Sequence, residues 1–273
     1  MKKMMIVLLT MALLVGSAAA ERVGGLTNLN TPSEADYMAA VQDVYANAQC
    51  IFMQGFDEVI SYRFYDSLNA MLMALQAGEI DSMDLPDFVA EPLLLSDAQY
   101  AIREMDLTPF WTGCCLGFRS EDTELREQVN AVLAEMRAEG RLALLTPRYI
   151  TGPEAEAGEA PTFERLEGAE SLVVAVTGDL PPLDYVAADG QASGFNVAVL
   201  AELGRRLHMN IELMNIETGA RAIALASERA DCVFWFMSSA FESDTGDDWD
   251  IPEGIALSEP YFSWNRWYLV GLK

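Results

Sequence analysis

In the second half of the chain, the spacing of apolar residues alternates between the pattern of a strand and the pattern of a helix. Residues 172–176 form a short continuous apolar run, typical of a buried strand, and residues 195–207 repeat apolar side chains at helical spacing. Two further strands are predicted over 211–216 and 232–237, with a helix over 220–229 between them. Strands that alternate with helices in this way predict parallel pairing with right-handed crossovers.

The first half of the chain also alternates predicted strands with predicted helices. Both halves are therefore predicted to form open α/β sheets. A helix is expected to begin near Asp66 or Ser67 and to end at Gly78, because short polar residues cap helix starts and glycine ends helices. In such sheets ligands bind beyond the carboxyl ends of the strands. Strands are predicted over 22–26, 59–64 and 80–85, and helices over 32–45, 65–77 and 123–139.

Residues 151–168 separate the two halves. This stretch is rich in Pro, Gly, Glu and Ala and shows no apolar period. Such a composition predicts an exposed linker.

The start of the chain has the pattern of a cleavable secretory signal over residues 1–20. Lys2 and Lys3 precede an apolar run over 4–15, and small residues end it at Ala20. A retained membrane anchor is the alternative, but the run is shorter than the roughly 20 residues that a spanning helix needs. We therefore expect a periplasmic or extracellular protein that is soluble after signal cleavage.

The charge and cysteine content of the chain limit the kinds of partner and site that can be expected. The chain has 42 acidic and 17 basic side chains, which argues against nucleic acid as a partner because its phosphates require Lys and Arg. No C-x-x-C spacing exists and His208 is the one histidine, so neither a metal site nor a cofactor is predicted. Cys114, Cys115 and Cys232 lie in apolar runs and are interpreted as buried thiols, although an oxidising destination leaves disulfides with Cys50 open.

Specific motifs in the second half resemble a known family. Residues 171–207 contain a G-x-x-P-P turn and a G-F-x-V helix start, and residues 256–272 contain an S-x-P-Y motif. Together they resemble the amino-acid-type (family 3) extracellular solute-binding proteins. The resemblance implies an α/β, two-lobed type II periplasmic-binding fold, with the first lobe over 169–273.

The first half resembles the remainder of the same family. Residues 22–28 and 61–94 are similar to its second lobe, and residues 114–150 are similar to its closing strand and final helices. The resemblance implies a second lobe over 21–113, a closing strand and helices over 114–150 that pack on the first lobe, and a linker over 151–168. The lobes thus occur in permuted order. Circular permutation is favoured, and a tandem of two eroded copies stays an alternative.

The resemblance also implies a function without chemistry. Members of the family capture a small molecule by closing two lobes, and hand it to a membrane ABC permease. An amino acid or a related polar or cationic compound is the expected partner, and no enzyme is predicted, since the sequence has no Ser-His pair or metal set. The alternatives are a ligand-free sensory or scaffold module of the same fold and, third, a dehydratase- or lyase-type enzyme.

Several positions that hold the ligand in the family differ in this chain. Ser243 or a neighbour stands where the family carries an arginine of the first lobe, and Leu183 stands where it carries an aromatic residue. Without the arginine, recognition of a carboxylate loses its main donor. If the acidic and aromatic residues face the cleft, a cationic or sugar-like solute would suit it better than an anion. The expected ligand-binding residues are Asp179, Tyr185, Trp235, Ser238 and Ser239 in the first lobe and Thr27, Asn28, Asp84 and Asp87 in the second.

Each of these positions has a plainer interpretation. Trp235 follows a strand pattern, and such residues are more often packed in the core than in contact with a ligand; the aspartates are more often solvated turn residues or caps. Residues 242–250 loosely resemble a calcium loop, but they lack its residue order, and a solvated loop is predicted.

Overall fold

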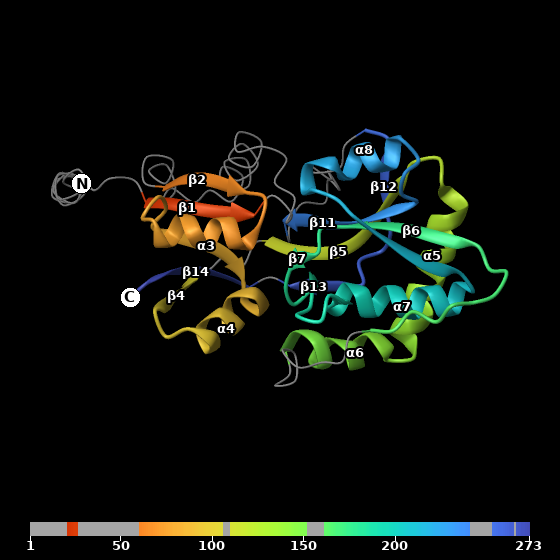
Figure 1. Cartoon of the computed structure of the whole chain (residues 1–273), viewed down its shortest axis with the longest axis horizontal. Coiled ribbons are helices and arrows are strands. Elements are labelled where there is room, and N and C mark those ends of the chain that lie inside the picture. The colour runs from red at the N-terminus through yellow and green to blue at the C-terminus, as the bar shows by residue number, and fades with distance from the viewer. Residues whose placement is uncertain (1–20, 27–59, 106–109, 152–160, 241–252, 265) are drawn as a thin grey trace, which may run out of the picture.

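The computed structural model describes two α/β lobes that lie side by side along the long axis of the molecule (Figure 1). The described residues are 21–26, 60–105, 110–151, 161–240, 253–264 and 266–273. The predicted signal (1–20), the predicted helix over 32–45 and the segment 242–250 lie outside them. Within the described part, no helix is long and apolar enough to cross a membrane. The α/β class predicted from the sequence is confirmed.

The left-hand lobe in Figure 1, here called the second lobe, is built on a five-stranded sheet. Its parallel part has β1 (Glu21–Leu26) between β2 (Ile60–Tyr65) and β3 (Ser82–Pro86). The antiparallel β14 (Trp267–Leu272) follows β3 and pairs in turn with β4 (Tyr100–Met105). Two helices pack on this sheet, α3 (Leu68–Gln76) and α4 (Asp87–Ser96).

The right-hand lobe, here called the first lobe, has a sheet in the order β10-β6-β11-β5-β12. As predicted, β10 (Asn210–Asn215), β6 (Ser171–Val176) and β11 (Cys232–Ala240) are parallel. The long strand β5 (Phe110–Arg119) is antiparallel to β11, and the short strands β12 (Ile255–Leu257) and β13 (Phe262–Trp264) pair with β5.

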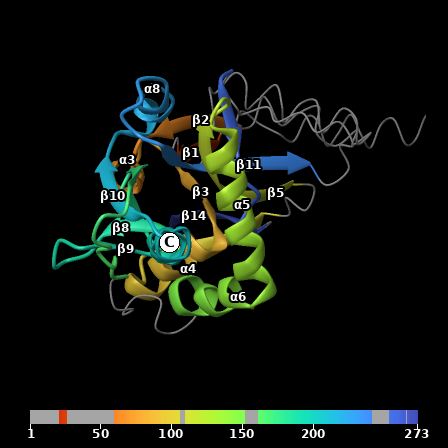
Figure 2. The same cartoon turned by 90° about the vertical axis from the view of Figure 1, so that its right-hand side faces the viewer.

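Helices cover both faces of the first-lobe sheet, as Figures 1 and 2 show with α8 above it and α6 and α7 below. These helices are α5 (Thr123–Ala138), α6 (Arg141–Thr146), α7 (Phe195–Leu207) and α8 (Arg221–Ala226). Successive strand residues point to opposite faces. Accordingly, Val174 and Phe234 are buried with α5 and α7 in the main core, whereas Val233 and Trp235 are buried in a second cluster with residues of α8.

Each of the two large sheets contains one strand from the other half of the chain. The first lobe receives β5, which follows the second-lobe strand β4, and the second lobe receives β14, which follows the first-lobe strand β13. The two lobes are thus joined by two crossings. Val23 of β1 and Gly271 of β14 both pair with Ser82 of β3, so the start of β1 and the end of β14 lie on either side of one strand.

Local chemistry explains where several elements begin. The Ser67 hydroxyl accepts a hydrogen bond from the Ala70 amide at 3.1 Å and caps α3, as predicted. Gly78 and Gly140 follow α3 and α5 with φ of 71° and 73°, a region that glycine adopts without strain. The helix predicted over 220–229 is shorter in the structure and spans α8 alone.

The segment after β3 differs from the expectation. No helix was predicted over this segment, but residues 87–96 form α4, with Pro92 inside the helix. Proline disfavours a helix interior because it lacks an N–H. Burial explains the helix nevertheless, since Phe88, Val89 and Ala90 are at most 4% exposed and anchor its first turn in the core.

The carboxyl-terminal part of the predicted linker is attached to the first lobe. The side chain of Asn210 binds both backbone groups of Leu166. It accepts a hydrogen bond from the Leu166 amide at 2.8 Å and donates one to the Leu166 carbonyl at 3.0 Å. The ring of Phe163 packs against the main core. The described part of the predicted linker, residues 161–168, is therefore attached to the first lobe, although most of its side chains are exposed.

Candidate functional site

The carboxyl ends of parallel strands from both lobes point toward the boundary between the lobes. In Figure 1 the arrowheads of β1 and β2 point to the first lobe, and the arrowhead of β11 points back to the second. The strand β3 is parallel to β1, and β6 is parallel to β11. Residues that follow these strands therefore converge at the lobe boundary, where open α/β sheets place their ligands.

Two of the expected second-lobe residues lie at this end of β3. Asp84 is buried within the strand, at 7% exposure. Asp87 is the first residue of α4, accepts a hydrogen bond from the Phe88 amide at 2.8 Å and lies 3.9 Å from the guanidinium of Arg266. Burial raises the pKa of Asp87 above its ordinary value, while that hydrogen bond opposes the shift. Thr27 and Asn28 lie outside the described residues.

Aromatic rings join the two lobes beside Asp87. The Phe88 ring, from the second lobe, lies 5.6 Å from the Phe262 ring and 4.9 Å from the Trp264 ring, both from β13 of the first lobe. Both contacts are edge-to-face, an arrangement that aromatic pairs favour. Trp264 in turn lies 6.0 Å from Trp267, the first residue of β14. The lobe boundary therefore includes a continuous aromatic contact along one crossing.

The expected first-lobe residues occupy two places. Asp179 begins β7 (Asp179–Leu180) and is paired with Tyr185 of β8 (Asp184–Val186), and both side chains are half-buried. Ser238 and Ser239 belong to the last part of β11, opposite Thr112 and Trp111 of β5. β7 and β8 continue into β9 (Ala192–Ser193) and form the small third sheet.

Trp235 is buried, at 5% exposure, and is covered by an arginine that the sequence did not single out. The guanidinium of Arg221 lies 4.7 Å from the centre of the Trp235 ring and donates to the Phe234 carbonyl at 3.3 Å. Arg221 is itself only 7% exposed. Burial lowers its pKa to about 10, with Asp184 opposing the shift, so the guanidinium remains charged at neutral pH.

The loop after β6 is held by a buried carboxylate. Asp184 accepts hydrogen bonds from the Thr177 hydroxyl at 3.2 Å, from the Gly178 amide at 3.1 Å and from the Asn196 amide group at 3.2 Å. Burial raises the pKa of Asp184 above its ordinary value, and these three hydrogen bonds oppose the shift. The loop is therefore fixed by a charge that its neighbours satisfy.

The three family motifs meet at this loop. The Phe195 amide donates to the Pro182 carbonyl at 3.0 Å, and the ring of Phe195 stacks on Tyr261 of the S-x-P-Y motif at 6.1 Å. A Cβ on Gly194 would lie 2.4 Å from the Leu183 carbonyl oxygen, so the close approach requires glycine at this position. The motifs thus shape the backbone at the end of β6.

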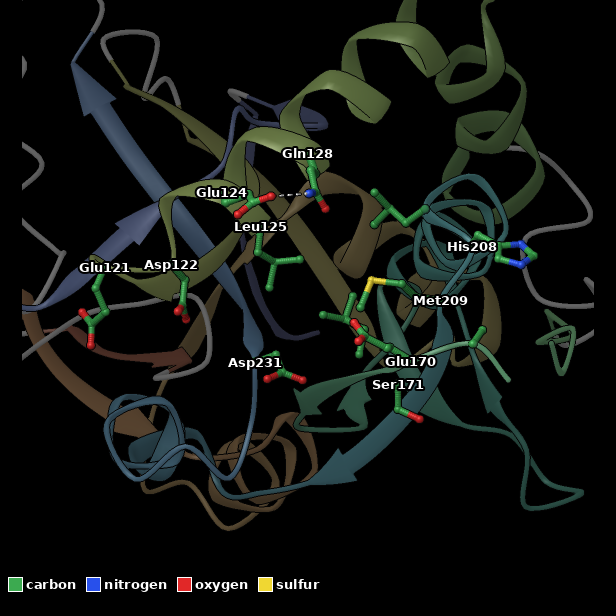
Figure 3. Close-up of a pocket in the computed structure, with 13 residues that line it drawn as sticks. Glu121, Asp122, Glu124, Leu125, Gln128, Glu170, Ser171, His208, Met209 and Asp231 are labelled. Carbon is green, nitrogen blue, oxygen red and sulfur yellow. Dashed lines mark hydrogen bonds between the residues drawn. The ribbon is translucent and has the colours of Figure 1, made fainter. Parts of the chain in front are cut away.

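A cavity of about 820 Å³ lies at the opposite end of the first-lobe sheet (Figure 3). Acidic residues line it beside the amino ends of α5, β6 and β11, and Figure 3 shows the imidazole of His208 pointing away from them. Asp122 is paired with Arg119 at 2.7 Å, and Glu121 and Glu124 are exposed to solvent. The cavity is thus a solvated acidic surface that lies away from the lobe boundary.

The thiols of the described residues are buried. Cys114, Cys115 and Cys232 have no measurable exposure and form no disulfide with one another, and Cys50 lies outside the described residues. Burial raises the pKa of Cys114 well above its ordinary value. No group of three metal-ligating side chains occurs in the part of the chain that the structure describes.

Two α/β lobes, two crossings and strand ends that converge between the lobes define a two-lobed binding fold of the type II periplasmic class. Residues 172–244 match the model of the bacterial extracellular solute-binding proteins, family 3. This match supports the family resemblance found in the sequence, over residues 172–244 of the first lobe.

The similar proteins differ in the share of this chain that they match. The histidine-binding periplasmic protein of Salmonella typhimurium is 33% identical over 101 residues, which correspond to 34% of this chain and 37% of that protein. The chain thus spans little more than a third of that relative. The ligand-binding component of an ABC-type import system from Staphylococcus aureus, solved with zinc bound, is 9% identical at a TM-score of 0.44 and covers 93% of this chain and 66% of its own.

Two further solved structures show the same level of similarity. The periplasmic binding protein AgaA of A. tumefaciens R10, in complex with agropinic acid, is 11% identical at a TM-score of 0.44, over 80% of this chain and 58% of its own. The oxidised form of OxyR is 9% identical, also at a TM-score of 0.44, over 94% of this chain and 87% of its own.

Proposed function

We propose that the chain is an exported solute-binding protein that captures a small polar molecule between its two lobes. The observation that carries this proposal is the convergence of the carboxyl ends of β3 and β6, from different lobes, on one boundary crossed by two chain segments. The family 3 sequence of the first lobe supports it. The bound molecule is then handed to an ABC-type importer, and no chemical step is involved.

We further propose an amino acid or a related cationic compound as the solute. A relative named for histidine binding supports this choice, as does the acidic character of the chain, with a net charge of −25. Asp87 is the residue best placed to meet a cation, because it is half-buried at the boundary and begins α4. Residues 1–20 would direct export.

Calorimetric titration of the purified chain with L-histidine, L-lysine, putrescine and glucose tests this proposal. We expect one of the first three to bind, and Asp87→Ala to weaken that binding at least tenfold, since a buried or half-buried charge contact is worth more than ~1.4 kcal/mol. Asp97→Ala, which removes an exposed acid after α4, is the matched control. Absence of heat and of thermal stabilisation with all four compounds would contradict the proposal.

The order of the lobes is proposed to be a circular permutation. Val23 and Gly271 flank the same residue, Ser82, in neighbouring strands, so their separation is about two strand spacings, or roughly 10 Å. A linker of about four residues would span it. A rearranged chain that begins at residue 161 and joins residue 273 to residue 21 is expected to fold with the melting temperature of the parent within a few degrees.

The alternative of two eroded tandem copies leads to a different outcome. In that case the segments before and after residue 160 are parts of separate folds, and the rearranged chain would not form one cooperative unit. A broad or double unfolding transition of the rearranged chain, with a normal transition of the parent, would favour the tandem arrangement.

A second candidate function is a ligand-free scaffold of the same fold. The direct contact of Phe88 with Phe262 and Trp264 supports it, because the lobes already touch through side chains of the chain itself. Small-angle scattering separates the two candidates. A binder is expected to contract when its solute is added, whereas a scaffold keeps one radius of gyration with every compound.

A further inference from the structure

A line of buried hydrogen bonds crosses the first lobe toward the end of β6. The Tyr261 hydroxyl donates to Asn196 Oδ1 at 2.8 Å, and Asn196 Nδ2 donates to Asp184 Oδ1 at 3.2 Å. The second oxygen of Asp184 accepts from the Gly178 amide at 3.1 Å. Tyr261, Asn196 and Asp184 are 5%, 0% and 3% exposed, so water cannot readily replace a lost partner.

At one end of this line, Tyr261 is next in sequence to a residue that contacts the second lobe. Tyr261 directly precedes Phe262, whose ring meets Phe88 of the second lobe at 5.6 Å. Phe195 packs against both neighbours, at 6.1 Å from the Tyr261 ring and 5.3 Å from the Phe262 ring. The Tyr261 amide also donates to the Cys114 carbonyl at 2.9 Å. A displacement of Phe88 therefore acts on the residue next to Tyr261.

The inner end of the line is the backbone that enters the third sheet. Gly178 follows β6 with φ of 70°, and its carbonyl accepts from the Val186 amide at 3.1 Å. Asp179, the next residue, pairs with Tyr185. The backbone conformation at Gly178 thus determines where these two side chains stand at the lobe boundary.

We propose that Tyr261, Asn196 and Asp184 are positioning residues that couple the location of the second lobe to the backbone of residues 177–179. A buried polar group that loses its partner is costly, so the members of the line shift together rather than separately. Movement of Phe88 against Phe262 is then transmitted to Gly178. The purpose of this coupling rests on the proposed solute-binding function, but the coupling itself does not.

Amide hydrogen exchange in the purified chain, followed by NMR without added solute, tests the coupling. Tyr261→Phe removes one hydroxyl, and we expect the Gly178 amide to exchange about tenfold faster because Asp184 is held less firmly. Phe88→Leu keeps an apolar side chain but removes the ring contact, and it is expected to accelerate the same amide. Tyr100→Phe is the matched control, since that hydroxyl accepts from Gln76 in the second lobe.

The Val132 amide, inside α5, reports global opening in every variant. An unchanged Gly178 amide in Tyr261→Phe and Phe88→Leu would overturn the coupling, as would equal acceleration of Gly178 and Val132. Because no solute is present, failure of the chain to bind histidine or its analogues leaves this result untouched.

Discussion

Arg221 is the residue whose role is least visible in the sequence. An arginine of the first lobe was sought only near residue 243, where the family carries one, and none was found between Arg229 and Arg266. The structure places Arg221 at the start of α8, buried over the ring of Trp235. The sequence signal was a single charged side chain at the start of the otherwise apolar segment 220–226, which is uncommon in a buried helix.

Replacement of Arg221 is therefore expected to destabilise the first lobe. Arg221→Ala removes a desolvated cation–π contact and leaves a void, and we expect a loss of about 2 kcal/mol in the free energy of unfolding. Urea unfolding measures this loss. Arg229→Ala, at an exposed position just after the same helix, should change the free energy by less than about 0.5 kcal/mol. Equal effects of the two substitutions would contradict the buried contact.

Asp184 gives the first lobe a pH dependence of defined sign. Because burial raises its pKa in the folded state above the ordinary value of 3.8, the folded chain retains this proton to higher pH than the unfolded chain does. Its contribution to stability is therefore greatest below pH 3.8 and falls as the pH rises through the folded-state pKa.

Asp184→Asn removes this titration while keeping the size of the side chain. The measured quantity is the free energy of unfolding of the parent minus that of the variant. This difference should decrease as the pH rises from acidic to neutral. Tyr100→Phe, which removes a hydroxyl beside Gln76 in the second lobe, is the control and should leave the pH dependence of the parent unchanged. A difference that increases with pH would show that the pKa of Asp184 is lowered instead.

At the scale of elements, an ion-pair cluster fastens the helices from the first half of the chain to α7. Glu202 of α7 accepts from Arg141 of α6 at 2.8 Å and from Arg205 at 3.0 Å. Burial alone would raise the pKa of Glu202, but the hydrogen bond from Arg205 and the charge of Arg141 hold it below its ordinary value of 4.5. The cluster thus stabilises the fold above pH 4.5 and weakens as the pH falls.

Glu202→Gln should lower the free energy of unfolding by about 1 kcal/mol at neutral pH, because it removes the central charge of a partly buried cluster. The loss should shrink below pH 4.5 and in high salt. Glu124→Gln, at an exposed site on α5, provides the control and should cost less than about 0.5 kcal/mol. A salt-independent loss at Glu202 would argue for packing in place of charge.

The period of apolar positions predicted most elements, but only those with an uninterrupted pattern. The strands β6, β10 and β11 and the helices α5 and α7 were located within a few residues, since each has a continuous run or a clear helical face. The helix α4 escaped because Pro92 interrupts its pattern, and its burial against β3 and β14 is a tertiary effect. The short strands β7, β8 and β9 are too brief to show any period.

The candidate site was predictable in part for a related reason. Asp179, Asp87 and Asp84 follow or end predicted strands, so their place at the carboxyl ends could be inferred from chain order. The contacts of Phe88 with β13 could not, because they join residues from opposite ends of the chain. Long-range pairs of this kind leave no mark on local spacing.

At the scale of the whole molecule, the exchanged strands predict that the two halves of the chain stay together after cleavage. A protease site introduced within residues 152–160 and then cut should give two fragments that elute as one species, because β5 from the first fragment pairs along its length with β11 from the second. Size-exclusion chromatography under native conditions measures this. Separation of the fragments in buffer without denaturant would contradict the exchange.

The same arrangement predicts a single unfolding transition. Each of the two large sheets needs one strand from the other half of the chain, so neither half of the chain can complete its sheet alone. Calorimetry of the uncut chain should give equal calorimetric and van't Hoff enthalpies. Two resolved peaks would indicate that the lobes fold independently in spite of the crossings.

The exchange of strands also determines when each strand can pair with its neighbours during synthesis of the chain. Among the described strands β14 is translated last, yet it lies between β3 and β4 of its sheet. The strand β5 is translated well before its partner β11. The apolar residues of β5, including Cys114 and Cys115, stay without their sheet neighbours during that time. Contacts so distant in sequence form slowly. We therefore expect the nascent chain to expose these apolar residues until β11 and β14 have been made.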